Sequence, residues 1–174
     1  MHLLPEQLTA LQTFSGLNSA HAERICKSLG TKHFSAEDTI LDEGKSVQAL
    51  WLILEGECRV TRTTASGRTR VLADLKAGDV FGEMSFVRDA PHSASIVASS
   101  EVIVCTYRRE DYRDFANECP DAAMQISFNI AAVLAERLRR MDSWVCELMN
   151  RPEEAERRDE WQDFRSAVYT NWQF

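Results

Sequence analysis

The sequence predicts an α+β chain, mainly β, built as an antiparallel β-roll or jelly roll with helices on both flanks. From about residue 34 to residue 107, turn signals recur every eleven or twelve residues, at Gly44, Gly56, Gly67 and Gly78. The runs between these glycines are short, and they are either apolar or alternate between apolar and polar residues. Such spacing is typical of antiparallel sandwiches and barrels, whereas both flanks show helical periodicity.

The expected strands are runs of four or five residues between these turns. They are Leu50–Leu54, Cys58–Thr61, Arg70–Ala73, Ser95–Ala98 and Val102–Cys105. Ser66-Gly67 predicts a hairpin turn between the second and third of these runs. The spacings favour a small β-roll over a parallel sheet.

The N-terminal flank is expected to be helical. Four apolar residues recur on one helical face: Ala22, Ile25, Cys26 and Leu29. Asn18 is the expected N-cap of this helix, and Gly30 is its expected C-terminal stop. A shorter helix is expected between Pro5 and Thr13.

Helix is expected again over Arg109–Ala116, followed by a long helix from Pro120 to about residue 149. Its apolar residues follow a spacing of 4, 3, 4 and 3: Leu134, Leu138, Met141, Val145 and Leu148. A repeat of 3.5 residues suits pairing with a second helix, which predicts a homodimer through residues 120–149. Packing of the same face on the β-roll of its own chain is an equal alternative.

The C-terminal residues 151–174 are expected to form a helical aromatic tail, separate from a domain over residues 1–150. Asn150 and Glu153 match a capping box that would restart a helix. The tail then places apolar residues at helical spacing: Trp161, Phe164, Val168 and Trp172. This face is too apolar for a solvated helix, so it is expected to cover the β-roll or a partner.

Composition narrows the function classes. The 174 residues carry a net charge of −7, which argues against broad electrostatic binding to nucleic acid or to an anionic membrane. The five cysteines and four histidines are scattered, without a CxxC or HExxH spacing, so no metal site and no disulfide framework is expected. Without a secretory start or a spanning segment, a cytoplasmic location is expected.

The chemistry of the chain is concentrated in Phe81-Gly82-Glu83-Met84-Ser85-Phe86 and the following His92-Ser93-Ala94-Ser95. Gly82 lets a ligand approach the backbone closely, and the first N–H groups of a short helix there would favour an anion. A carboxylate such as Glu83 would repel a phosphate but can accept hydrogen bonds from sugar hydroxyls. Amides for a phosphate and a carboxylate for a sugar together suggest a nucleotide.

In this order the segment resembles the phosphate-binding cassette of the cyclic nucleotide-binding domain family. The resemblance covers about residues 15–148 and includes Ile40–Gly44 and Trp51–Gly56 before the cassette. It implies a β-roll that holds cyclic AMP, ahead of cyclic GMP, with Glu83 on the ribose 2′-hydroxyl and Ser93 near the phosphate. The ligand-binding residues implied are Phe81, Gly82, Glu83, Met84, Ser85, His92, Ser93 and Ala94.

His92 departs from the family pattern, because that position normally carries an arginine. Arginine offers a permanent charge and a rigid fork for two phosphate oxygens, whereas histidine is mostly neutral near pH 7. Losing a charge-assisted hydrogen bond weakens binding by about ten- to a hundredfold. Arg88 could partly substitute, or it could be a solvated loop charge.

The expected function is a stand-alone regulatory module that binds a cyclic nucleotide and signals through its C-terminal helices to a protein partner. The alternative is a degenerate domain that acts as an interaction scaffold, with weak or no nucleotide binding because of His92. No catalytic residue is expected, and a cupin-like enzyme lacks its histidine-rich metal motif. Only about two dozen acidic and aromatic residues follow the long helix, so direct DNA binding is not expected.

Overall fold

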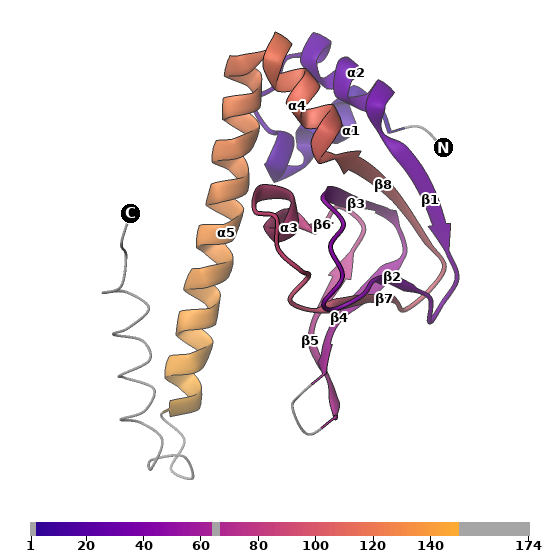
Figure 1. Cartoon of the computed structure of the whole chain (residues 1–174), viewed down its shortest axis with the longest axis vertical. Helices are drawn as coiled ribbons and strands as arrows, with labels where there is room; N and C mark the ends of the chain where they lie inside the picture. Colours follow the sequence, from indigo (N-terminus) through magenta and orange to yellow (C-terminus); the bar gives the residue numbers. More distant parts are fainter. Residues whose placement is uncertain (1–2, 64–66, 150–174) are drawn as a thin grey trace. The chain divides into compact units, whose positions relative to one another are not determined.

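The computed structural model describes residues 3–63 and 67–149, and it describes only the backbone of residues 144, 145 and 147–149. The chain forms two compact units, residues 1–130 and residues 131–174. The described strands all belong to the first unit (Figure 1). The expected tail helix of residues 151–174, with its aromatic face, lies outside the described residues, as does Ser66 of the expected hairpin turn. The expected domain boundary at residue 150 stays a prediction.

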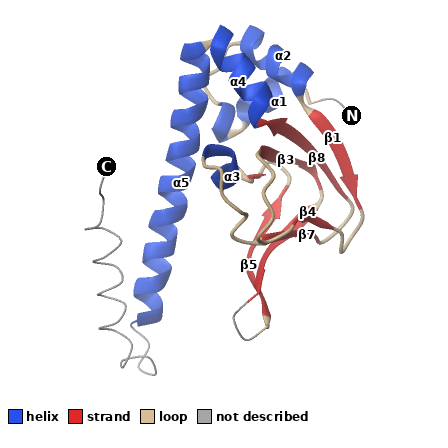
Figure 2. Ribbon diagram, viewed as in Figure 1, coloured by secondary structure: helices blue, strands red, loops and turns tan. Residues whose placement is uncertain are grey.

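Helices stand before, within and after the β-region (Figure 2). They are α1 (Pro5–Ala10), the 3-10 turn η1 (Gln12–Phe14), α2 (Ser19–Ser28), α3 (Glu83–Val87), α4 (Arg109–Glu118) and α5 (Pro120–Met149). The Asn18 side chain accepts a 2.8 Å hydrogen bond from the His21 N–H, which confirms the predicted N-cap of α2.

Eight described strands form two four-stranded antiparallel sheets. The strands are β1 (Gly30–Phe34), β2 (Thr39–Leu41), β3 (Ala49–Glu55), β4 (Glu57–Thr63), β5 (Thr69–Lys76), β6 (Val80–Phe81), β7 (Ser95–Ala98) and β8 (Val102–Arg108). One sheet has the order β1-β8-β3-β6, and the other has the order β2-β7-β4-β5. This confirms the predicted β-roll.

The pairing of the strands is nested. β4 pairs with β5, β3 with β6, β2 with β7, and β1 with β8, and successive pairs alternate between the two sheets. The eight strands therefore follow the path of one long hairpin that is rolled up into two packed sheets. This is the jelly-roll topology. The roll begins at Gly30, four residues earlier than the sequence predicts, because β1 is polar and mostly exposed and lacks an apolar run.

The β3–β4 turn needs glycine. Gly56 has a φ of +85°, and a Cβ built there would lie 2.1 Å from the Glu101 carbonyl oxygen. No side chain fits at that distance, so the turn can pack against the start of β8 only with glycine.

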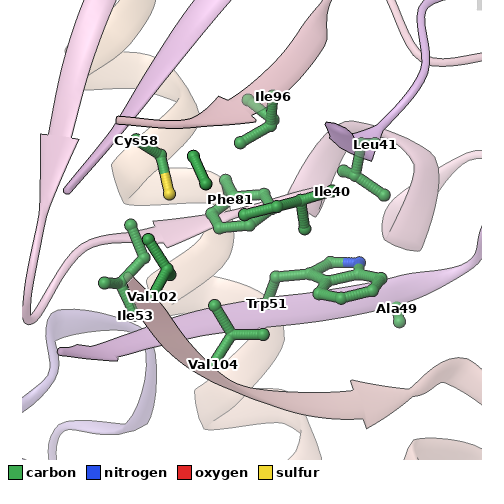
Figure 3. Close-up of a cluster of buried hydrophobic side chains, with 11 residues drawn as sticks. Ile40, Leu41, Ala49, Trp51, Ile53, Cys58, Phe81, Ile96, Val102 and Val104 are labelled. Atoms are coloured by element: carbon green, nitrogen blue, oxygen red, sulfur yellow. The ribbon is translucent and has the colours of Figure 1, made fainter. Parts of the chain in front are cut away.

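The core between the sheets uses the two-residue period of the strands. Ala49, Trp51 and Ile53 of β3 point into one cluster, with Phe81 and Val104 from neighbouring strands (Figure 3). Leu50 and Leu52, which alternate with them, are also buried, so β3 is covered on both faces.

A second set of aromatic rings joins the helices to β8. Tyr107 lies 6.1 Å from Phe14 of η1 and 6.4 Å from both Phe86 of α3 and Tyr112 of α4, measured between ring centroids. Asn129 of α5 adds a polar tie, since its side chain donates a 2.9 Å hydrogen bond to the Ser15 carbonyl. The contact between Phe86 and Tyr107 holds α3 against β8.

The first part of α5 has a buried and an exposed face. Ile126 and Ile130 are buried, whereas Met124 and Phe128 are 68% and 73% exposed. Further along, Leu138 and Met141 of the predicted helix-pairing face are also exposed, and the side chains of Val145 and Leu148 lie outside the described residues.

Candidate functional site

The candidate site is the cassette formed by residues 81–94. It begins at Gly82, which has a φ of +81° and stands immediately before α3. A Cβ at this position would lie 2.7 Å from the Ala49 carbonyl oxygen and 2.9 Å from Cδ1 of Trp51. Gly82 is thus required both by its backbone conformation and by its close approach to β3.

Two aromatic contacts anchor α3 at its ends. Phe81 stacks on Trp51 with ring centroids 5.9 Å apart and an interplanar angle of 12°. Phe86 packs edge-on against Tyr112 at 5.3 Å. The first hydrogen bond within α3 joins the Phe86 N–H to the Gly82 carbonyl at 3.0 Å. The short helix is therefore pre-organised by its surroundings rather than by its own length.

The side chains of α3 differ in their exposure to solvent. Glu83 and Ser85 are buried, at 5% and 2% exposed, whereas Met84 and Val87 are 57% and 52% exposed. A buried carboxylate is uncommon outside functional or paired positions. Exposed apolar residues also lie on β5, where Val71 and Leu72 are each 58% exposed.

His92 is buried, and both of its ring nitrogens have partners within the protein. Nε2 accepts a 3.1 Å hydrogen bond from the Val47 N–H, and Nδ1 lies 2.7 Å from the Ser85 hydroxyl oxygen. Because Nε2 accepts, the proton of the neutral ring lies on Nδ1, which donates to Ser85. Burial lowers the pKa of His92 below its ordinary value of 6.5, with a smaller opposing effect from Asp42. The ring is therefore mostly neutral at pH 7.

The backbone of His92 reinforces this connection. Its N–H donates to the Lys45 carbonyl at 2.8 Å, and its carbonyl accepts from the Gly44 N–H at 2.9 Å. With the Val47 contact, three hydrogen bonds join His92 to residues 44–47. His92 therefore connects the β2–β3 loop to α3 through Ser85.

The remaining predicted residues lie at the cassette's outer side. Ser93 is exposed and its hydroxyl lies 3.8 Å from the Met84 sulfur, while Ala94 is half-buried. The Ser95 hydroxyl accepts a 2.9 Å hydrogen bond from the Glu43 N–H. Arg88, the one Lys or Arg between residues 81 and 94, is exposed at the C-terminal end of α3.

Sequence reasoning missed the residues that support the cassette. Ala49 and Trp51 lie against Gly82, and Val47 bonds the His92 ring. The sequence predicts β3 as a strand. Its contact with Gly82 joins segments about thirty residues apart, and local residue spacing cannot predict such a contact.

The described part of the chain offers no group of three or more His, Cys, Asp or Glu side chains that could hold a metal ion. Within the same ranges, no helix combines the length and the apolar character that crossing a bilayer requires. The polar groups of the cassette are its backbone amides, the Glu83 carboxylate and the Ser85 and Ser93 hydroxyls.

Comparisons with known proteins agree with this geometry. The family model described as "Cyclic nucleotide-binding domain" matches residues 31–119. The "Cyclic AMP receptor protein" of Thermus thermophilus is 39% identical over 129 residues, which cover 74% of this chain and 58% of that protein. A "cAMP-dependent protein kinase regulatory subunit" of Yarrowia lipolytica is 28% identical over 61% of this chain and 28% of its own length.

A solved structure shows the same fold. The crystal structure of the Thermus thermophilus Catabolite Activator Protein superposes with a TM-score of 0.70 and 32% identity, covering 79% of this chain and 62% of that chain. The chain spans less than two thirds of the length of each of these relatives.

Proposed function

Because the chain belongs to the cyclic nucleotide-binding domain family, we propose that its cassette binds a cyclic nucleotide, cyclic AMP ahead of cyclic GMP. The chain is a cyclic nucleotide-binding regulatory domain by family. The choice of cyclic AMP is supported by the names of its relatives, a cyclic AMP receptor protein and cAMP-dependent kinase regulatory subunits.

The observation that carries the proposal is the arrangement at Gly82 and Glu83. The glycine is held against β3 by close packing, and the next side chain is a buried carboxylate. Backbone groups of Gly82, Met84 and Ser85 would contact the ligand, and Glu83 would accept a hydrogen bond from the ribose 2′-hydroxyl. Ser93, which is exposed, would donate to the phosphate.

His92 has an indirect role in this proposal. Its ring is neutral and bonded to Val47 and Ser85, so it positions α3 and the 44–47 loop instead of supplying a charge. Without a charge-assisted bond worth about 1.5–3 kcal/mol, affinity is expected to fall about ten- to a hundredfold below that of an arginine-bearing site.

Calorimetry on the full chain tests the proposal. Cyclic AMP is titrated first, then cyclic GMP and 5′-AMP, the last to test the need for the cyclic phosphate. Glu83→Gln should weaken cyclic AMP binding about tenfold, because a charged acceptor for the ribose hydroxyl is lost. Glu101→Gln, at an exposed turn, is the matched control.

A second candidate is supported by the same histidine. Since both ring nitrogens of His92 already have protein partners, the cassette could serve as a structural element of an interaction scaffold. Absence of heat with either cyclic nucleotide at millimolar concentration would favour the scaffold over the sensor.

The output is proposed to pass through the C-terminal helices to a protein partner. α3 is tied to α4 through Phe86 and Tyr112, and the Tyr112 hydroxyl donates a 3.0 Å hydrogen bond to the Ala123 carbonyl of α5. Hydrogen exchange over residues 120–149 should change on saturation with cyclic AMP. An identical exchange pattern with and without ligand would refute this route.

A further inference from the structure

A cavity of about 410 Å³ lies at the junction of β1, β3, β8 and α4. Lys32, Trp51, Arg108 and Arg113 are among its lining residues, one from each of these elements. No residue of the cassette, 81–94, lines it. Its volume falls in the range of small-molecule sites.

The cavity is strongly basic in an acidic protein. Lys32, Arg108, Arg109 and Arg113 line it with one carboxylate, Glu110, although the chain carries a net charge of −7. Arg108 bonds Glu110 at 2.9 Å. Among the described residues, the other three cations form no ion pair.

This leaves three cations without an ion pair around one small space. Arg109 and Arg113 are four residues apart on α4, so their like charges face each other on one side of the helix and disfavour it. An anion between them would convert this repulsion into attraction.

Trp51, which lines the cavity, carries an unused hydrogen-bond donor. Trp51 is 3% exposed, and its indole Nε1 has no hydrogen-bond partner among the described residues. In the core cluster, the Trp51 ring lies toward Ala49 (Figure 3). Ala49 also lines the cavity. The Lys32 ammonium lies 4.8 Å from the centroid of the same ring. A buried donor without a partner is costly, so an acceptor that reaches Nε1 from the cavity would satisfy it.

We propose that this basic cavity is a second ligand site, which binds a small organic anion with phosphate or carboxylate groups. The three spare cations favour a ligand with two or three negative charges, and the cavity volume restricts it to a metabolite-sized molecule. The site is separate from the cassette but adjoins it, because Trp51 contacts Gly82 and Val47 bonds His92.

Calorimetry with the full chain in a zwitterionic buffer, without any cyclic nucleotide, tests this site. Pyrophosphate and citrate are the probes, and they distinguish a preference for phosphate from one for carboxylate. Sodium chloride at matched ionic strength corrects for general screening. Saturable binding of either probe at millimolar concentration or below is expected. Absence of binding by both would overturn the proposal, whatever the cassette binds.

Variants locate the binding. Lys32→Gln with Arg109→Gln should raise the Kd about tenfold or more, because two charge-assisted contacts are lost. Lys27→Gln with Lys76→Gln removes the same charge from exposed positions outside the cavity and should leave the Kd within about twofold. Equal affinities for the two double variants would overturn the site.

Trp51→Phe provides an independent readout. It keeps a ring for Phe81 to stack on and removes the Nε1 donor, so the Kd should rise about three- to tenfold. Circular dichroism and the urea midpoint establish that each variant is folded. Full affinity in a folded Trp51→Phe protein would contradict the role of the indole donor.

Discussion

At the residue scale, His92 is a neutral connector where its family places a cation. Its two ring nitrogens bond Val47 and Ser85, and its backbone bonds the 44–47 loop. The sequence alone showed that position 92 carries a histidine in place of the family's arginine, and so lacks its permanent charge. The sequence could not show that the ring nitrogens of His92 have hydrogen-bond partners within the protein, because one partner, Val47, lies 45 residues away along the chain.

The lowered pKa of His92 predicts acid sensitivity. Well above pH 6.5 the ring is neutral in both folded and unfolded chains, so it contributes no pH dependence there. Below that value the unfolded chain binds the proton more readily, so the free energy of unfolding should fall, by at most about 1.4 kcal/mol per pH unit, until the lower folded pKa is passed.

Urea unfolding at pH 7.5 and pH 5.5 measures this loss. His92→Gln, which keeps an acceptor for Val47 and a donor for Ser85, should lose less stability between the two pH values than the wild type. His33→Gln, at an exposed histidine of β1, controls for loss of an imidazole. Equal losses in His92→Gln and the wild type would contradict the prediction.

Restoring the family residue gives a second prediction. His92→Arg should tighten cyclic AMP binding about tenfold, because a guanidinium supplies a charged fork for the phosphate. It should also lower the free energy of unfolding by about 1–2 kcal/mol, since Val47 and Ser85 lose their partner. Calorimetry and urea unfolding measure the two effects. Unchanged affinity in a folded variant would mean that position 92 does not reach the phosphate.

At the scale of elements, α3 is five residues long and depends on neighbours for its position. Gly82 fits between the Ala49 carbonyl and Trp51, and Phe81 and Phe86 hold either end. The sequence predicted the turn, the short helix and its glycine. It did not predict which strand the glycine packs on, since that contact arises only when the roll closes.

Gly82→Ala tests how much this close approach matters. Gly44 has a φ of +82°, nearly that of Gly82, but a Cβ there meets nothing within 4 Å. Both alanine variants carry the backbone strain, and only Gly82→Ala adds the clash with β3. Urea unfolding should therefore show Gly82→Ala to be less stable than Gly44→Ala by about 1–3 kcal/mol. Equal costs would mean that β3 yields to the extra methyl group.

Other elements show why parts of the fold were predictable. α2 carried its own signals, an Asn18 cap and a helical apolar face, and the structure confirms the predicted start. β1 carried none, because all but one of its residues are exposed and its place is set by pairing with β8. Local sequence signals are enough to predict α2, whereas β1 is defined only by its long-range pairing with β8.

At the scale of the whole molecule, the nested strand pairing brings the first and last strands together. The regular glycine turns were enough to predict the roll. They did not predict the order of the strands or which residues meet across the roll. The same closure joins β1, β3 and β8 to the start of α4, which creates the basic cavity from residues as far apart as Lys32 and Arg113. A sequence pattern had no means of showing this site.

The long helix supports a prediction about assembly. Leu138 and Met141 are exposed and follow the 3.5-residue spacing of a helix-pairing face. We expect a homodimer in sedimentation equilibrium, and Leu138→Glu with Met141→Glu should shift it to monomer. Ala132→Glu with Ser143→Glu adds the same charge at exposed positions off this face and should leave the dimer intact. A wild-type monomer at high concentration would contradict the prediction.

Trp51 both contacts Gly82 of the cassette and lines the basic cavity. Thermodynamic linkage requires that any influence of one ligand on the other through this shared wall be reciprocal. With an anion in the cavity, the apparent nucleotide affinity becomes a property of the protein and its medium together. A cyclic AMP titration in phosphate buffer would then report a different constant from one in a zwitterionic buffer, and the ionic composition of the cell would set the operating range of the cassette.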